Sequence, residues 1–105
     1  MHVIIDQDIP IAEDIRLVKR LYKVPKEKAY PKGIKFAYQY LIYRDSEWID
    51  ICRVDNYRHD KIKTGTHVHK LNAKEVQFSD MDFEEAEEYA ISLSERIAKE
   101  LLKKW

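Results

Sequence analysis

The fold is decided by residues 34–55, which read IKFAYQYLIYRDSEWIDICRVD. The first ten of these residues are rich in aromatic and branched side chains, which favour an extended strand. The polar run at 44–47 predicts a tight turn, and Trp48–Asp55 then returns as the second strand of a hairpin. Tyr38 and Tyr40 share one face of the first strand, where we expect them to form core beneath a helix; the alternative is an open platform on which unpaired bases stack.

The flanking segments add further strands. Ile15–Val24 alternates basic and apolar residues, and Thr64–Leu71 and Glu75–Phe78 are shorter strand candidates. His2–Ile5 reads as another short strand. The pattern of Asp8–Asp14 fits a short helix with a proline in its first turn equally well, so both interpretations of the N-terminal segment stay open.

The C-terminal segment carries the clearest helical pattern. Its apolar residues recur at steps of three and four, which places them on one stripe of a helix over about Phe83–Lys103. Asp82 can cap the start of this helix, with Glu85 three residues further on. We therefore expect a single α+β domain over residues 1–105, with an antiparallel sheet of four to five strands and a long C-terminal helix packed on one face.

Composition places the chain among globular proteins. It has 105 residues, 45% of them hydrophobic, and charged residues reach 36%, above the ~25% of an average domain. The one cysteine, Cys52, excludes a disulfide scaffold and a cysteine-rich zinc site. No apolar run is long enough to span a membrane and no basic signal segment is present, so we expect a cytoplasmic protein. Asn and Gln are scarce beside Lys and Glu, which favours a thermophile as the source.

The net charge of zero is the sum of unlike parts. Residues 1–14 hold four acids and no Lys or Arg, residues 15–74 carry a net charge of +9, and residues 75–105 carry −5. The basic middle can form a local face for a polyanion such as RNA. The acidic ends can also fold back and neutralise it, and the charge pattern leaves both interpretations open.

Residues 52–70 hold the densest group of side chains that could carry chemistry, including three of the four histidines. Arg53 and Asp55 are two positions apart, as are His67 and His69, so each pair would share one face of a strand. Imidazoles titrate near neutral pH, so a histidine pair can accept one proton and donate another, as cleavage of RNA by its own 2′-hydroxyl requires. Arg53, Arg58 or Lys70 can supply the cation that stabilises the phosphate.

Two other interpretations of the same residues remain open. His67, His69 and either His59 or Asp55 could form a three-ligand metal site with an open position. The histidines could also be ordinary surface residues, with Asp55 and Asn56 shaping the turn after their strand.

The same residues resemble the TumE-type proteins of bacterial and archaeal toxin–antitoxin systems. Members carry an R-x-D-N-x-x-H segment, here Arg53–His59, followed by an H-x-H segment, here His67–His69. The resemblance covers about Arg16–Phe78. Two departures concern the motifs themselves, because Arg58 stands where many members have proline and Thr66 precedes a single His-x-His where many have Pro-His-His-x-His.

The resemblance implies a toxin that acts on RNA, as a small metal-independent endoribonuclease without a cofactor, partnered by a small antitoxin. In that scheme the catalytic candidates are His67 and His69, which share the acid–base work, Arg53, which stabilises the phosphate, Asp55, which orients a histidine or Arg53, and His59, which assists. The RNA-binding candidates are Arg58, Lys70, Tyr57, Lys61 and Lys63. The acidic helix could dock a basic antitoxin segment or a second copy of the chain, which leaves a homodimer open. The alternative function is a non-catalytic module that binds nucleic acid or protein.

Overall fold

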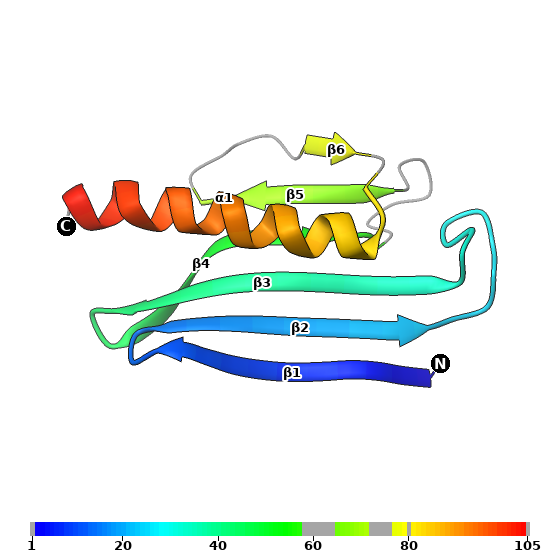
Figure 1. Cartoon of the computed structure of the whole chain (residues 1–105), viewed down its shortest axis with the longest axis horizontal. Coiled ribbons are helices and arrows are strands. Elements are labelled where there is room, and N and C mark those ends of the chain that lie inside the picture. The colour runs from blue at the N-terminus through cyan, green and yellow to red at the C-terminus, as the bar shows by residue number, and fades with distance from the viewer. Residues whose placement is uncertain (1, 58–64, 72–76, 80, 105) are drawn as a thin grey trace.

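The computed structural model describes residues 2–57, 65–71, 77–79 and 81–104, with 77–79 described by their backbone alone. Each strand of one antiparallel sheet pairs with the strand before it, and one long helix lies across the sheet (Figure 1). The elements are β1 (His2–Ala12), β2 (Ile15–Lys23), β3 (Ile34–Arg44), β4 (Glu47–Asp55), β5 (Thr66–Lys70), β6 (Gln77–Ser79) and α1 (Phe83–Lys104). The expected α+β class is confirmed, with five strands plus the three-residue β6. None of the described segments is a helix long and apolar enough to cross a membrane.

The central hairpin of β3 and β4 follows the predicted pattern. Asp45 and Ser46 both have positive φ, of 53° and 67°, as a two-residue type I′ turn requires. Just beyond this turn Tyr43 pairs with Trp48, and their ring centroids lie 5.1 Å apart. The turn geometry therefore sets the register of the whole hairpin.

Helix α1 covers one face of the sheet and is capped as predicted. Asp82 Oδ1 accepts hydrogen bonds from the backbone N–H groups of Glu84 and Glu85 over 3.1 and 2.9 Å. The Glu85 side chain accepts in return from the Asp82 N–H over 3.4 Å, which completes a capping box. The helix contacts β3 and β4, where Tyr38 and Tyr40 are buried. The expected place of these two tyrosines beneath the helix is confirmed.

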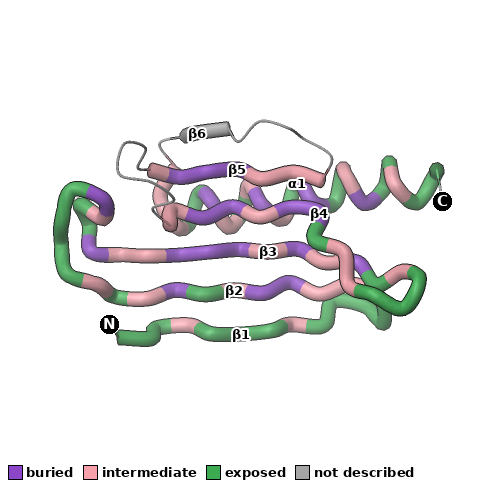
Figure 2. Tube along the Cα trace, turned by 180° about the vertical axis from the view of Figure 1, so that it is seen from behind, coloured by how far each residue is buried: buried purple, intermediate pink, exposed green. Residues whose placement is uncertain are grey.

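The N-terminal segment is one strand of eleven residues and has no helical turn. Among the described strands, β1 pairs with β2 alone and forms an edge of the sheet. Pro10 lies within it, which an edge strand tolerates because one side of its backbone makes no ladder bonds. Most of its side chains are exposed, including Val3, Ile4 and Ile11, as the green tube in Figure 2 shows.

The alternation of side chains along β4 positions the candidate site. Successive residues of a strand point to opposite faces of the sheet. Cys52 and Val54 belong to the core shared with α1, and burial raises the pKa of the Cys52 thiol. Arg53 and Asp55 therefore lie on the face away from α1, which is turned toward the viewer in Figure 2.

Candidate functional site

Four polar residues from two neighbouring strands meet on the face of the sheet away from α1. In the β4–β5 ladder, Arg53 pairs with His69 and Asp55 pairs with His67. The ring centroids of the two histidines lie 6.3 Å apart. The two predicted pairs thus each share a face, and the strand register joins them into one group. We call Arg53, Asp55, His67 and His69 the β4–β5 cluster.

The carboxylate of Asp55 holds this cluster together. It is fully buried, its Oδ2 accepts a hydrogen bond from Arg53 Nε over 2.9 Å, and His69 Nε2 lies 3.5 Å from the same oxygen. Its Oδ1 accepts from the backbone N–H of Tyr57 over 2.9 Å. Such partners are what a buried carboxylate requires, since burial alone disfavours its charged form. The carboxylate therefore orients the Arg53 guanidinium and lies close to the His69 imidazole.

His67 lies deeper in the structure than His69. It is only 1% exposed, and its Nε2 lies 2.8 Å from the backbone oxygen of Tyr57. A carbonyl oxygen only accepts, so His67 Nε2 carries the hydrogen of this bond. The bond fixes the orientation of the ring.

Arg53 and His69 are the members of the cluster that reach the surface. Their side chains are 34% and 30% exposed, whereas Asp55 and His67 are buried. Arg53 uses its Nε–H for Asp55, and a guanidinium carries four further N–H donors that can bind a phosphate. The cluster can therefore present a cation and an imidazole, already oriented, to a bound anion.

A second polar group, formed by Tyr57, Lys35 and Tyr22, lies next to the cluster. Of these three residues, only Tyr57 was a predicted site residue. Lys35 Nζ lies 4.4 Å from the centroid of the Tyr57 ring, and Tyr22 is the partner of Lys35 in the β2–β3 ladder. Burial, with neighbouring Tyr22 and Asp55, raises the pKa of Tyr57 to about 12. Only the register of β2 against β3 shows that Tyr22 and Lys35 meet Tyr57, and no motif in the sequence carries that information.

Asn56 ties the end of β4 to β3. Its Nδ2 donates to the backbone oxygen of Ile34 and its Oδ1 accepts from the backbone N–H of Phe36, both over 2.8 Å. The side chain therefore continues the ladder beyond the last residue of β4. Of the two residues expected to shape the turn, Asp55 bonds the nearby backbone of Tyr57, whereas Asn56 bonds the neighbouring strand.

The remaining predicted site residues are not part of the cluster. Lys70 pairs with Cys52, so it shares the helix-facing side of the sheet and points away from His69. Four candidates lie outside the described residues: Arg58, His59, Lys61 and Lys63. Within the described ranges, no three His, Cys, Asp or Glu side chains are grouped to hold a metal ion. The alternative metal site that uses His59 as its third ligand involves a residue outside those ranges.

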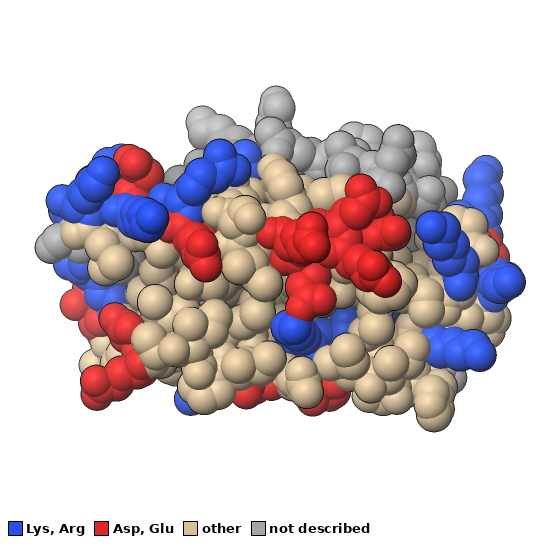
Figure 3. Space-filling model, viewed as in Figure 1, with Lys and Arg blue, Asp and Glu red and all other residues tan. Residues whose placement is uncertain are grey.

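Charge on the helix-bearing side is divided. Figure 3 shows acidic side chains gathered over the middle of this side and Lys and Arg toward its two ends.

Ion pairs join β2 to both of its acidic neighbours. Lys19 pairs with Glu87 of α1, and Arg16 and Arg20 pair with Asp8 and Asp6 of β1. The acidic terminal segments thus contact basic residues of β2, as one of the two charge interpretations expected.

Comparisons with known proteins add no relative. No family model, curated protein or solved structure matches the chain. The geometry of the β4–β5 cluster and the motif resemblance are therefore the basis for a functional proposal.

Proposed function

We propose that the chain is a TumE-like toxin that cleaves RNA, as a small histidine-based endoribonuclease. The observation that carries the proposal is the position of Asp55 Oδ2, which accepts a hydrogen bond from Arg53 Nε and lies 3.5 Å from His69 Nε2, where the cluster reaches the surface. The resemblance of the two motifs that contain these residues supports it. A small antitoxin protein is the partner that this proposal implies.

The reaction class is an internal transesterification. The 2′-hydroxyl of RNA attacks the adjacent phosphorus and the bond from phosphorus to the 5′-oxygen breaks, which leaves a 2′,3′-cyclic phosphate and a 5′-hydroxyl. One proton must leave the 2′-oxygen and one must reach the 5′-oxygen. His69, the less buried of the two imidazoles in the cluster, exchanges one of these protons, and Arg53 stabilises the charge on the non-bridging oxygens.

The burial of His67 changes the division of work between the two histidines. Because its Nε2–H is bound to the Tyr57 oxygen, His67 positions the cluster in this proposal and does not contact RNA. Asp55 orients both His69 and Arg53. The second proton is assigned to His59 from the motif alone, since that residue lies outside the described ranges.

The test is cleavage of single-stranded RNA by the purified chain in EDTA, with analysis of the product ends. We expect 2′,3′-cyclic phosphate ends, no reaction with a 2′-deoxy substrate, and a rate lower by about 10²–10⁴-fold in His69→Ala. His2→Ala is the matched control, because His2 is exposed on β1 and far from the cluster in the strand order. Equal rates in the two variants would contradict the proposal, and cleavage that is lost in EDTA would favour the metal site.

A non-catalytic binding module is the second candidate. The observation that favours it is the burial of Asp55 and His67, which is also typical of a polar network with a purely structural role. RNA would then bind without being cleaved. Arg53→Gln would weaken binding to all sequences alike and lower the slope of log affinity against log salt by about 1.

A further inference from the structure

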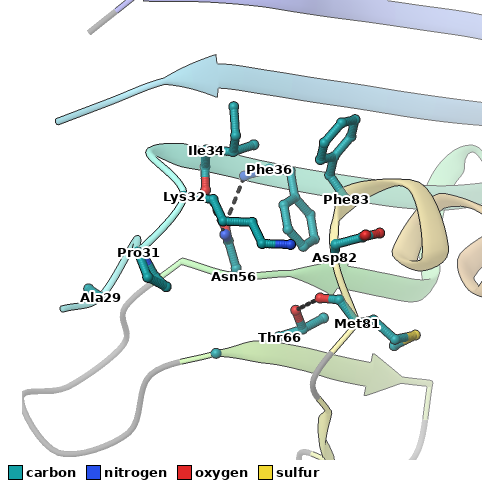
Figure 4. A pocket seen from close by; sticks show the side chains of 11 residues that line it. Ala29, Pro31, Lys32, Ile34, Phe36, Asn56, Thr66, Met81, Asp82 and Phe83 are labelled. Carbon is teal, nitrogen blue, oxygen red and sulfur yellow. Dashed lines mark hydrogen bonds between the residues drawn. The ribbon is translucent and has the colours of Figure 1, made fainter. Parts of the chain in front are cut away.

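A cavity of about 220 Å³ lies where α1 begins, on the helix side of the sheet (Figure 4). Its walls come from the loop before β3, the end of β4, the start of β5 and the first residues of α1. Sites for drug-sized ligands measure about 300–1,000 Å³. A cavity of this size therefore suits a single small planar or branched group.

Aromatic rings and two opposite charges line the cavity. Phe36 is buried beneath it and Phe83 is partly exposed, so an aromatic surface faces the ligand space. Figure 4 shows the Lys32 side chain extending toward Phe36, and Asp82 lying beside Phe83 at the helix start. The cavity thus combines a stacking surface with one cation and one carboxylate.

The other polar side chains of the lining are bound to the protein. The Thr66 hydroxyl donates to the backbone oxygen of Met81 over 2.7 Å, and the Asn56 amide is bound to β3. The Asp82 cap uses Oδ1, which leaves Oδ2 as the oxygen that can accept from a ligand. Specificity would therefore depend on Asp82 and charge attraction on Lys32.

The cavity and the β4–β5 cluster share one end of the sheet. Asn56 directly follows Asp55, and Thr66 directly precedes His67, so the cavity and the cluster lie on opposite faces of the same strand ends. The loop that forms one wall also carries three exposed lysines: Lys26, Lys28 and Lys32. A single strand of RNA that passes around this end can contact the lysines, the cavity and the cluster.

We propose that the cavity holds one unpaired base of the RNA, and that this base is guanine. The inference rests on the proposed action on RNA. Sequence-specific RNA sites stack unpaired bases on aromatic rings and bind their Watson–Crick edges by hydrogen bonds. Guanine alone places two N–H donors, N1 and N2, side by side, so that a single carboxylate oxygen such as Asp82 Oδ2 can accept from both. Adenine and cytosine set a ring-nitrogen acceptor beside their amino group, and uracil flanks its one N–H with two carbonyl oxygens, which a carboxylate repels. Lys32 contacts the phosphate.

The test is fluorescence anisotropy with four labelled heptanucleotides that have uridine at every position except the central one. All riboses carry 2′-O-methyl groups, so binding is measured without cleavage. We expect the oligonucleotide with central guanine to bind about tenfold more tightly than the others. Asp82→Asn should abolish this preference while the helix stays capped, because Asn caps a helix as well as Asp does.

Two further variants separate the proposed roles. Glu84→Gln removes a negative charge from the same helix turn but outside the cavity lining, and should keep the preference for guanine. Lys32→Gln should weaken all four oligonucleotides alike and lower the salt slope by about 1.

Equal affinity for the four bases, or a guanine preference that persists in Asp82→Asn, overturns the assignment of the cavity. This outcome is independent of the cleavage test, because the oligonucleotides cannot be cleaved. Guanine selectivity without ribonuclease activity would support the base pocket and contradict the proposed enzyme activity. Cleavage without base selectivity would support the enzyme activity and contradict the base pocket.

Discussion

Arg53 and His69 lie directly opposite each other in the β4–β5 ladder and approach the same oxygen, Oδ2 of Asp55, at 2.9 and 3.5 Å. One buried carboxylate therefore couples the two residues through which the cluster reaches the surface. A change of charge on either residue alters the field at the other. An ordinary surface ion pair has no such effect, because solvent screens it and it contributes little to stability.

Asp55→Ala tests whether this carboxylate holds the cluster. The variant leaves Arg53 and His69 without their shared anion and the Tyr57 N–H without its acceptor, so the free energy of unfolding should fall by about 2–4 kcal/mol. Urea denaturation would show a lower midpoint at an unchanged slope. Asp50→Ala, at an exposed aspartate of the same strand, should cost less than about 1 kcal/mol. Similar losses in the two variants would show that the cluster does not depend on Asp55.

The raised pKa of Tyr57 predicts a loss of stability at alkaline pH. The pKa is about 12 in the folded protein against an ordinary value of 10.0, so as pH rises the unfolded chain releases this proton first. Stability from this group is complete below pH 10 and is lost as pH rises from 10 toward 12. Urea denaturation at pH values on both sides of 10 should show this decline, and Tyr57→Phe should make it less steep. Part of the slope should remain, because burial also raises the pKa of Tyr38.

Tyr43→Phe is the control for that series, since Tyr43 is exposed and its ring packs on Trp48 at the hairpin end. Its alkaline slope should match the parent protein. If Tyr57→Phe also matched the parent, burial of the Tyr57 hydroxyl would make no contribution and the prediction would be wrong.

Asn56→Ala should loosen the end of β4. The variant loses two hydrogen bonds to β3, so the free energy of unfolding should fall by about 1–3 kcal/mol. Hydrogen exchange followed by NMR should show a faster amide at Phe36, which donates to Asn56, and an unchanged amide at Tyr38. Asn56→Asp keeps the acceptor for Phe36 and should restore part of its protection. Equal exchange at Phe36 in all three proteins would contradict the role assigned to Asn56.

Ser46→Gly should stabilise the central hairpin. Ser46 has a φ of 67°, a region that costs a residue with a side chain about 1 kcal/mol and glycine little. The expected gain is about 0.5–1 kcal/mol, or roughly 3–6 °C in Tm by thermal denaturation. Ser92→Gly, at an exposed position within α1, should have the opposite effect because glycine weakens a helix interior. A lower Tm for Ser46→Gly would contradict the turn assignment.

The helix and the central hairpin could be predicted because their signals are local. The helix has a regular apolar stripe and a cap at Asp82, and the hairpin has two apolar segments around a polar turn. The segment around Pro10 could not be decided in the same way. A proline fits the first turn of a helix and an edge strand equally well, and only the pairing of β1 with β2 settles which applies.

The sequence predicted which residues form the candidate site, but it did not predict how the two strands bring them together. Side-chain alternation predicted that Arg53 and Asp55 share a face, as do the two histidines. The register that sets Arg53 opposite His69 depends on the connection between β4 and β5, for which the sequence holds no local signal. Burial of His67 is a tertiary property for the same reason, so no motif could separate it from the more exposed His69.

The order of the strands bears on how the chain folds. Each strand pairs with the one before it, so the sheet can assemble by successive local closures that cost little loop entropy. Helix α1 follows all six strands and closes onto β3 and β4 from far along the chain. Until it docks, the apolar surface that includes Tyr38 and Tyr40 is open to water. During synthesis the uncovered sheet would be the species most prone to aggregate and to bind chaperones, and docking of α1 is the step that ends this exposure.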